Sequence, residues 1–275
     1  MLTHLESLAR PVGAMPWQTA AGSNSLAPLQ VSWAQSEAEV HAAQQLRYLV
    51  FVEEMGARPA QRGAADRNAR EADRFDSYCD HLLVRAAPCD EAPDGLVVGT
   101  YRVLRPAQAL RAGGFYCDSE FDLTPLASLR DSALELGRSC VHPAWRSGAV
   151  VMTMWRALGE FMLRHRLDTM IGCASIWLGD NGHSATQVWE QLRHRFMAPP
   201  HLRVLPREPM PLDAYPVVAG APAVEVPALI KAYLRCGARV LGPPARDAAF
   251  NTADLPLMMR FDDIAPRYRK HFLGQ

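Results

Sequence analysis

The feature of this sequence that most constrains its fold is the stretch from Leu134 to Met162. Its first half alternates apolar and polar residues and stops at Pro143, as a β-strand does. Its second half has the three- and four-residue apolar spacing of a helix, carried by Val151, Met154, Trp155, Leu158 and Met162. The sequence therefore predicts a strand, a tight turn and a helix. The N-terminus of such a helix presents unpaired backbone N–H groups and a positive dipole end, which favour a phosphate group.

Length and composition predict a globular protein with one hydrophobic core. The 275 residues are 49% apolar and 21% charged, as in folded rather than disordered chains. The net charge is zero, so no overall field attracts nucleic acid, and no nucleic-acid partner is expected. We recognise neither a signal peptide nor a membrane-spanning segment and expect a cytoplasmic protein. Residues 1–28 are expected to be a mobile arm and residues 29–275 a single domain.

The cysteine pattern predicts neither disulfides nor a metal centre. The six cysteines are scattered, and none forms a C-x-x-C motif or a zinc-ligand spacing with a nearby His. We therefore expect reduced thiols, no metal site and no permanently bound cofactor.

Periodicity and turn residues predict further strands and helices around the central stretch. The expected strands are 29–33, 81–86, 96–104, 169–175, 240–242 and 255–261. The expected helices are 36–55, 106–114, 184–195, 228–236 and 265–272. Long loops are expected at 57–73 and 198–226. This mixture predicts an α/β fold.

Charged residues within the predicted strands require partners. Arg102 lies in an otherwise apolar strand, and a buried guanidinium must be paired. Glu135 and Arg138 lie three residues apart in the central strand, so alternation places them on opposite faces unless a β-bulge intervenes. Gly137 between them favours such a bulge.

The turn before the central helix resembles the acyl-donor loop of the GNAT (Gcn5-related N-acetyltransferase) superfamily. The resemblance implies a mixed central sheet with a splayed parallel strand pair flanked by helices. The expected donor-binding residues are Cys140, Val141, Arg146, Ser147, Gly148 and Ala149. Ala149 and Val151 replace glycines of the family pattern, so a phosphopantetheine arm on acyl carrier protein fits the loop better than free coenzyme A. The alternative is an ordinary strand–helix connection with a solvated Arg146.

A wider set of residues resembles the acyl-homoserine-lactone synthases, which are GNAT-fold enzymes. This set is Arg47, Phe51, Asp73, Asp76, Arg102, Glu135 and Arg138. The segment from Pro227 to Gly237, with Asp254 after it, resembles a sister group, the L-ornithine Nα-acyltransferases. That resemblance covers roughly residues 31–272. It implies transfer of a 3-hydroxyacyl group from acyl carrier protein to the α-amine of L-ornithine, which gives lyso-ornithine lipid.

Aminolysis of a thioester needs a base that removes the ammonium proton, and Glu135 is the expected base, with Arg138 beside it. The alternative for Glu135 is a salt bridge with Arg138 or Arg102 that only orders the strand. The remaining expected substrate residues are Arg47, Phe51 and Arg102 together with the acids Asp73, Asp76 and Asp254. The arginines would bind the ornithine carboxylate and the acids its side-chain ammonium. The alternative is a closed ionic network that ties the first helix to the sheet.

Three further expectations concern partners and alternative functions. Met152, Trp155, Trp145 and Trp189 are candidates for an apolar tunnel that holds the acyl chain. Terminal basic residues, among them Arg269, are candidates for peripheral contact with the inner membrane. The alternative functions are a lactone synthase that uses S-adenosylmethionine, a GNAT enzyme that moves acyl groups from coenzyme A to another small amine, and a non-catalytic module that binds carrier protein.

Overall fold

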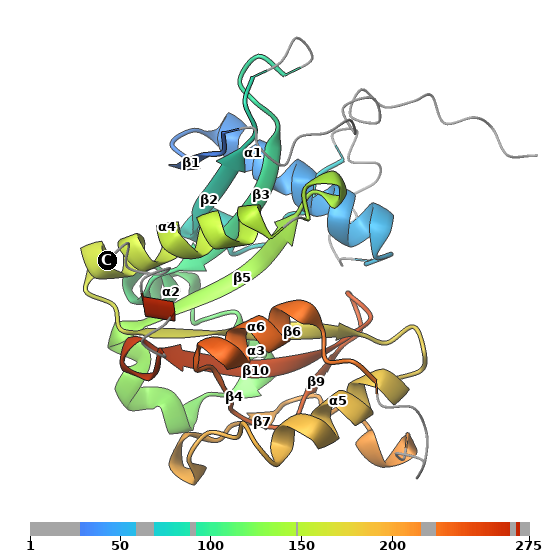
Figure 1. Ribbon diagram of the computed structural model, residues 1–275. Helices are drawn as coiled ribbons and strands as arrows, with labels where there is room; N and C mark the ends of the chain where they lie inside the picture. Colours follow the sequence, from blue (N-terminus) through green and yellow to red (C-terminus); the bar gives the residue numbers. More distant parts are fainter. Residues whose placement is uncertain are drawn as a thin grey trace, which may run out of the picture.

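The computed structural model describes residues 28–58, 69–88, 92–146, 148–215, 224–264 and 268–269. The expected N-terminal arm lies outside these residues except for Pro28, and so does the expected terminal helix except for Tyr268 and Arg269. Among the described residues, one mixed sheet has the strand order β1-β2-β3-β5-β6-β10-β8, and β9 pairs with β10 (Figure 1).

The strands of this sheet are β1 (Gln30–Trp33), β2 (Asp80–Arg85), β3 (Val97–Leu104), β5 (Ala133–Val141), β6 (Thr169–Trp177), β8 (Arg239–Val240), β9 (Ala245–Asp247) and β10 (Thr252–Arg260). A separate ribbon joins β4 (Phe121–Asp122) to β7 (Leu205–Pro206). The α-helices are α1 (Glu37–Arg47), α2 (Pro106–Ala112), α3 (Cys117–Glu120), α4 (Ala149–His165), α5 (His183–Arg193) and α6 (Ala228–Cys236). No helix of the described residues combines the length and the apolar character that a membrane crossing requires.

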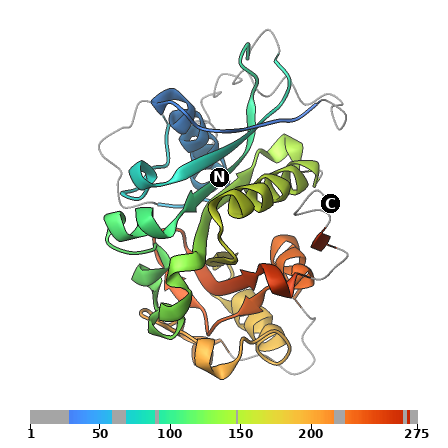
Figure 2. The ribbon, with the colours of Figure 1, turned by 90° about the vertical axis from the view of Figure 1, so that its left-hand side faces the viewer.

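The helices form a layer on each face of the sheet. Helices α4 and α6 lie on one side and α1, α2 and α3 on the other, as the view along the sheet shows (Figure 2). Residues of α4 such as Met154 and Leu158 are buried in a core with Leu82 and Val103 of the sheet. The predicted α/β class and the flanking helices are confirmed.

The predicted strand, turn and helix of the central stretch are confirmed as β5 and α4. Gly148 takes the left-handed conformation, with φ +89°, immediately before α4, which allows the sharp turn into the helix. The first helix differs in part from the prediction. Ser36 caps α1 as expected, but the helix continues from Tyr48 to Glu54 with π-helical hydrogen bonds before Gly56 ends it.

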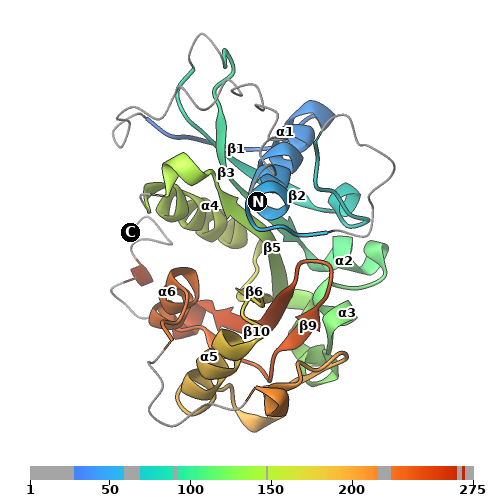
Figure 3. The same ribbon diagram turned by 90° about the vertical axis from the view of Figure 1, so that its right-hand side faces the viewer.

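Strands β5 and β6 run parallel and separate after three residue pairs. Ala133, Leu134 and Glu135 pair with β6, and the last pair is Glu135 with Ile171. Beyond it β5 stays on β3 while β6 stays on β10, so the two strands diverge (Figures 1 and 3). The expected splay is therefore present, and it begins after Glu135.

The expected bulge is also present in β5. Thr100 of β3 pairs with Cys140, whereas Arg102 pairs with Gly137, so β5 carries one extra residue between these pairs. The left-handed residue of the bulge is Arg138, with φ +49°, and not Gly137. Such a conformation is uncommon for a residue other than glycine and persists where surrounding contacts hold it.

Candidate functional site

The divergence of β5 and β6 opens a cavity of about 910 Å³. Its walls come from the bulged part of β5, the facing part of β6, the N-terminal turn of α4, helix α6 and the segment that joins β9 to β10. The polar residues in these walls include Arg102, Tyr116, Glu135, Arg138, Asp247 and Asp254. Phe51, which the sequence placed at the site, also lines the cavity.

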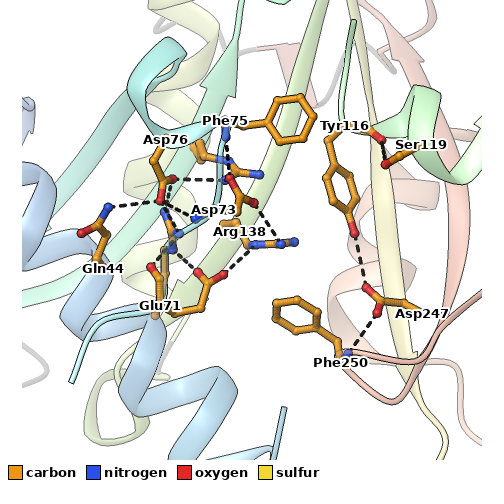
Figure 4. Close-up of polar contacts among 12 residues, drawn as sticks. Gln44, Glu71, Asp73, Phe75, Asp76, Tyr116, Ser119, Arg138, Asp247 and Phe250 are labelled. Atoms are coloured by element: carbon orange, nitrogen blue, oxygen red, sulfur yellow. Dashed lines mark hydrogen bonds and ion pairs between the residues drawn. The ribbon is translucent and has the colours of Figure 1, made fainter. Parts of the chain in front are cut away.

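One side of the cavity rests on a buried network of three arginines and three acids (Figure 4). Arg47 is fully buried and donates to Glu71 at 2.5 Å and to Asp76 at 2.7 Å. Arg102 donates to Asp73 at 2.6 Å and to Asp76 at 3.1 Å. Arg138 closes the network through Glu71 at 3.3 Å and Asp73 at 3.1 Å. The ionic network that was the alternative to a substrate-binding role for these residues is therefore present.

Opposing effects set the charges in this network. Burial raises the pKa of Asp76, but the charges of Arg47 and Arg102 outweigh it and hold that pKa well below its usual range. Burial lowers the pKa of Arg102, but Asp73 and Asp76 outweigh it and raise that pKa. These groups therefore stay ionised at neutral pH. Three positive and three negative charges balance, which is how charges this deeply buried are tolerated.

The network divides the predicted substrate residues into two groups. Arg102 and Arg138 line the cavity, whereas Arg47, Asp73 and Asp76 are not among its lining residues and position the two lining arginines. The guanidinium of Arg138 lies over the rings of Tyr116, at 5.0 Å, and Phe250, at 4.4 Å. This contact fixes the plane of Arg138 at the cavity wall.

Glu135 has a different set of partners from those expected. Its two carboxylate oxygens accept hydrogen bonds from the backbone N–H groups of Tyr116 and Cys117, both at 2.7 Å. The salt bridge with Arg138 or Arg102, which was the alternative to a catalytic role, is not formed, because the carboxylate instead binds backbone groups at the start of α3. Burial raises the pKa of Glu135, and the two backbone donors oppose that rise. The bulge places Arg138 on the same face as Glu135, since both contact Tyr116.

The opposite side of the cavity is acidic. Asp254 is buried and accepts a hydrogen bond from the Thr252 hydroxyl at 2.9 Å. Burial raises the pKa of Asp254, and the negative charge of Asp247 adds to this effect. Burial together with Asp254 and Asp247 raises the pKa of nearby Glu120 to about 7. Asp247 also accepts from the Tyr116 hydroxyl at 3.3 Å and from the backbone of Phe250 at 3.0 Å. A cation beside these acids would relieve their mutual repulsion.

Comparisons with known proteins agree with this geometry. Residues 46–156 match the family described as Acetyltransferase (GNAT) domain. The L-ornithine N(alpha)-acyltransferase of Rhodobacter capsulatus is 39% identical over 251 residues, which are 90% of this chain and 96% of that protein. The one of Agrobacterium fabrum is 38% identical over 255 residues, or 90% of this chain and 86% of that protein. This chain belongs to the L-ornithine N(alpha)-acyltransferase family. It is therefore an acyltransferase, as its sequence predicted.

Solved structures show the same fold. The acyl-homoserine-lactone synthase LasI has a TM-score of 0.51 at 12% identity, over 90% of this chain and 96% of that one. The N-acyl amino acid synthase FeeM from uncultured soil microbes has a TM-score of 0.50 at 10% identity, over 88% of this chain and 94% of that one. The GNAT-like fold expected for the L-ornithine N(alpha)-acyltransferase family is thus confirmed.

Five of the six predicted donor residues in this family member line the cavity: Cys140, Val141, Arg146, Gly148 and Ala149. The sixth, Ser147, lies outside the described residues. The charge of Arg146 is already paired, because its guanidinium donates two hydrogen bonds to Glu54, each at 2.6 Å. Burial raises the pKa of the Cys140 thiol far above neutral pH, so this thiol stays protonated. The roles of these residues toward a donor remain predictions.

Sequence reasoning missed two parts of the site. The sequence analysis assigned Glu71 only to a polar loop. A buried Arg47 requires a carboxylate partner, and this requirement could have pointed to Glu71. Asp247 was not chosen as a site residue, yet it lines the cavity. Of the expected tunnel residues, Met152 and Trp155 line the cavity, whereas Trp189 is buried in the core between α5 and the sheet.

Proposed function

We propose that this acyltransferase moves a 3-hydroxyacyl group from acyl carrier protein to the α-amine of L-ornithine and forms lyso-ornithine lipid. The observation that carries this proposal is the charge pattern of the cavity, with arginines on one wall and acids on the other. Ornithine carries a carboxylate at one end and a second ammonium at the other, so it matches both walls. The names of the relatives support the same acceptor.

The cationic wall would bind the ornithine carboxylate. Arg138 is the better placed of the two lining arginines, because its side chain is 13% exposed whereas that of Arg102 is 5% exposed. A planar guanidinium held between two aromatic rings offers a paired donor geometry to a carboxylate. Arg102, which also lines the cavity, is the second guanidinium of this wall.

The acidic wall would bind the side-chain ammonium. Asp254 and Asp247 line the cavity, and Glu120 lies close enough for all three to repel one another. An ammonium between them removes that repulsion and favours their charged forms. This arrangement selects a diamino acid over an amino acid with an uncharged side chain.

The chemistry requires a neutral amine and a stabilised oxyanion. Glu135 is the proposed base, and it takes the α-ammonium proton directly or through a water molecule, because two of its lone pairs accept backbone N–H groups and two remain free. Burial raises its pKa and so makes it a stronger base. The amine attacks the thioester carbon, and backbone N–H groups in the separated parts of β5 and β6 stabilise the oxyanion. The intermediate then expels the pantetheine thiolate, and the attacking nitrogen loses its second proton to that thiolate, which leaves an amide and a free thiol.

Carrier protein is the proposed donor because of the loop before α4. Ala149 and Val151 stand where the GNAT loop pattern has glycines, and Arg146 is already paired with Glu54, so the loop is poorly suited to a free diphosphate. A single phosphodiester, as on carrier protein, needs fewer backbone contacts from this loop.

The product is a single-chain amphiphile, and we infer that the protein acts in the cytoplasm with peripheral contact at the inner membrane. Arg267, Lys270 and His271, which the sequence assigned to that contact, lie outside the described residues.

A panel of acceptors tests this proposal. Purified protein is mixed with 3-hydroxyacyl carrier protein and, separately, with ornithine, lysine, S-adenosylmethionine or glycine, and the lipid products are identified by mass spectrometry. We expect acyl-ornithine only. If another acceptor is acylated and ornithine is not, ornithine is not the acceptor. Release of methylthioadenosine from S-adenosylmethionine would show that the protein is a lactone synthase. A parallel reaction with 3-hydroxyacyl coenzyme A tests the donor.

A further inference from the structure

The cavity adjoins a second, apolar pocket on the face covered by α4 and α6, and the residues that line both spaces form the junction between them. This second pocket has a volume of about 60 Å³. The residues that line both spaces are Tyr101, Leu136, Trp155, Cys173, Ala174 and Tyr233. Beyond them the pocket is walled by residues such as Leu158, Met170 and Met259. An acyl chain whose thioester lies between β5 and β6 and whose tail turns towards α4 and α6 would pass this junction.

Two hydroxyl groups meet at the junction. The hydroxyl oxygens of Tyr101, on β3, and Tyr233, on α6, lie 2.5 Å apart and share a hydrogen bond. Tyr101 is 4% exposed. The ring of Tyr233 stacks on Trp155 with 5.4 Å between the ring centroids. These contacts fix the position of both hydroxyls in an otherwise apolar environment.

A count of protons shows that this pair of hydroxyls can donate a hydrogen bond to a ligand. Each phenol carries one proton, and a single shared hydrogen bond uses only one of the two. The two hydroxyls therefore form a short chain with one bond between them. One O–H at an end of this chain remains available to donate. An O–H left without an acceptor in an apolar site is unfavourable, so the site gains from a ligand oxygen there.

We propose that the hydroxyl pair of Tyr101 and Tyr233 recognises the 3-hydroxyl group of the acyl donor. This inference rests on the proposed function and assigns one of its substrate features to two residues. The third carbon of an acyl chain lies two bonds from the thioester carbon. With the thioester carbon beside Leu136, which lines both spaces, the hydroxyl on the third carbon would face the junction. The two tyrosines are specificity residues and take no part in bond making.

Donor discrimination tests this assignment. The values of kcat/KM with ornithine are measured for a 3-hydroxyacyl and an unsubstituted acyl carrier protein of equal chain length. The proteins compared are the wild type, Tyr233→Phe, the double variant Tyr101→Phe with Tyr233→Phe, and the control Tyr215→Phe. Tyr215 packs against His183 and is not among the cavity-lining residues. The double variant removes both hydroxyls, so neither is left without its partner.

We expect the wild type and Tyr215→Phe to prefer the hydroxylated donor. In Tyr233→Phe and in the double variant, that preference falls by about 10-fold, the effect of one lost hydrogen bond, through a lower kcat/KM for the hydroxylated donor alone. An equal fall with both donors would show a structural or chemical role and overturn the assignment, as would an unchanged ratio.

Binding of the two donors without acceptor separates this inference from the proposed function. Dissociation constants of both acyl carrier proteins are measured for the same variants. If the wild type acylates no ornithine yet binds the hydroxylated donor more tightly in a way that depends on Tyr233, the acceptor proposal fails and the assignment of the tyrosines stands. If ornithine is acylated but both donors bind equally, the assignment fails and the acceptor proposal stands.

Discussion

Glu135 pairs in register with Ile171, and this is the last residue pair that joins β5 to β6. The same residue holds α3 through two backbone hydrogen bonds. Glu135 is the proposed base, and it also marks the point at which the sheet opens. Its carboxylate holds the cavity wall that contains Tyr116. This coupling makes substitutions of Glu135 informative only when stability is measured beside turnover.

Glu135→Gln is expected to lower kcat by about 100-fold or more, the effect of losing a general base. The amide keeps one oxygen acceptor and turns its NH2 group towards the other backbone N–H, which leaves that buried donor without an acceptor, so the free energy of unfolding should fall by about 1–3 kcal/mol. Steady-state kinetics and urea denaturation provide the two values. Near-normal turnover in the folded variant would exclude Glu135 as the base.

Arg47→Ala should be far more destabilising than a substitution in an exposed ion pair. It leaves Glu71 and Asp76 buried without their main partner, and we expect a loss of about 3–5 kcal/mol in the free energy of unfolding. The matched control is Arg156→Ala, which breaks an exposed pair with Glu160 and should cost less than about 0.5 kcal/mol. Similar losses in the free energy of unfolding of the two variants would contradict the claim that the buried network stabilises the fold.

Asp254→Asn and Asp247→Asn should weaken selection of a diamino acid. Each removes one negative charge from the wall proposed for the side-chain ammonium, so KM for ornithine should rise by about 10- to 100-fold. The control acceptor is 2-aminopentanoate, which has no side-chain ammonium and should be used equally by both variants and the wild type. A parallel change in KM for both acceptors would show that these aspartates do not read the ammonium.

The acidic wall should also reduce stability as pH rises. The pKa of Glu120 is raised from 4.5 to about 7 by burial, Asp254 and Asp247, so the folded protein binds this proton more tightly than the unfolded chain. The stability that the bound proton contributes is complete below about pH 4.5 and is lost as pH rises through about 7. In urea denaturation between these values, Glu120→Gln should lose less stability than the wild type or the exposed control Glu53→Gln. Identical profiles for all three would contradict the raised pKa.

Local signals in the sequence predicted much of the fold. Helix α6 has the predicted bounds because Pro227 precedes it and Gly237, with φ +118°, ends it where a side chain would meet the backbone of Asp263. Gly172, in the predicted strand 169–175, allows a close approach of the backbones of β5 and β6, since a Cβ there would lie 2.4 Å from the carbonyl oxygen of Leu136. Both features depend on residues that are neighbours in the sequence or on a single glycine.

The parts that escaped prediction depend on contacts between distant segments. Arg138 adopts a left-handed conformation that favours glycine, and its bonds to Glu71 and Asp73 hold it there. The partners of Glu135 are backbone groups at the start of α3, and no pattern of side chains in the sequence predicts such contacts. Strand β9 has only three residues and forms because β10 is beside it. Tertiary contacts, and not local propensity, decide such features.

The central claim is that acyl transfer takes place in the cavity between β5 and β6, and filling this cavity tests it most directly. Gly137 lines the cavity, and a Cβ added there would meet nothing within 4 Å, so Gly137→Trp should fill the space with little strain. The measurement is the initial rate of acyl-ornithine formation from 3-hydroxyacyl carrier protein. We predict that Gly137→Trp keeps the wild-type Tm and loses this activity, whereas Gly137→Ala retains most of it. A folded Gly137→Trp variant as active as the wild type would place the reaction elsewhere in the protein.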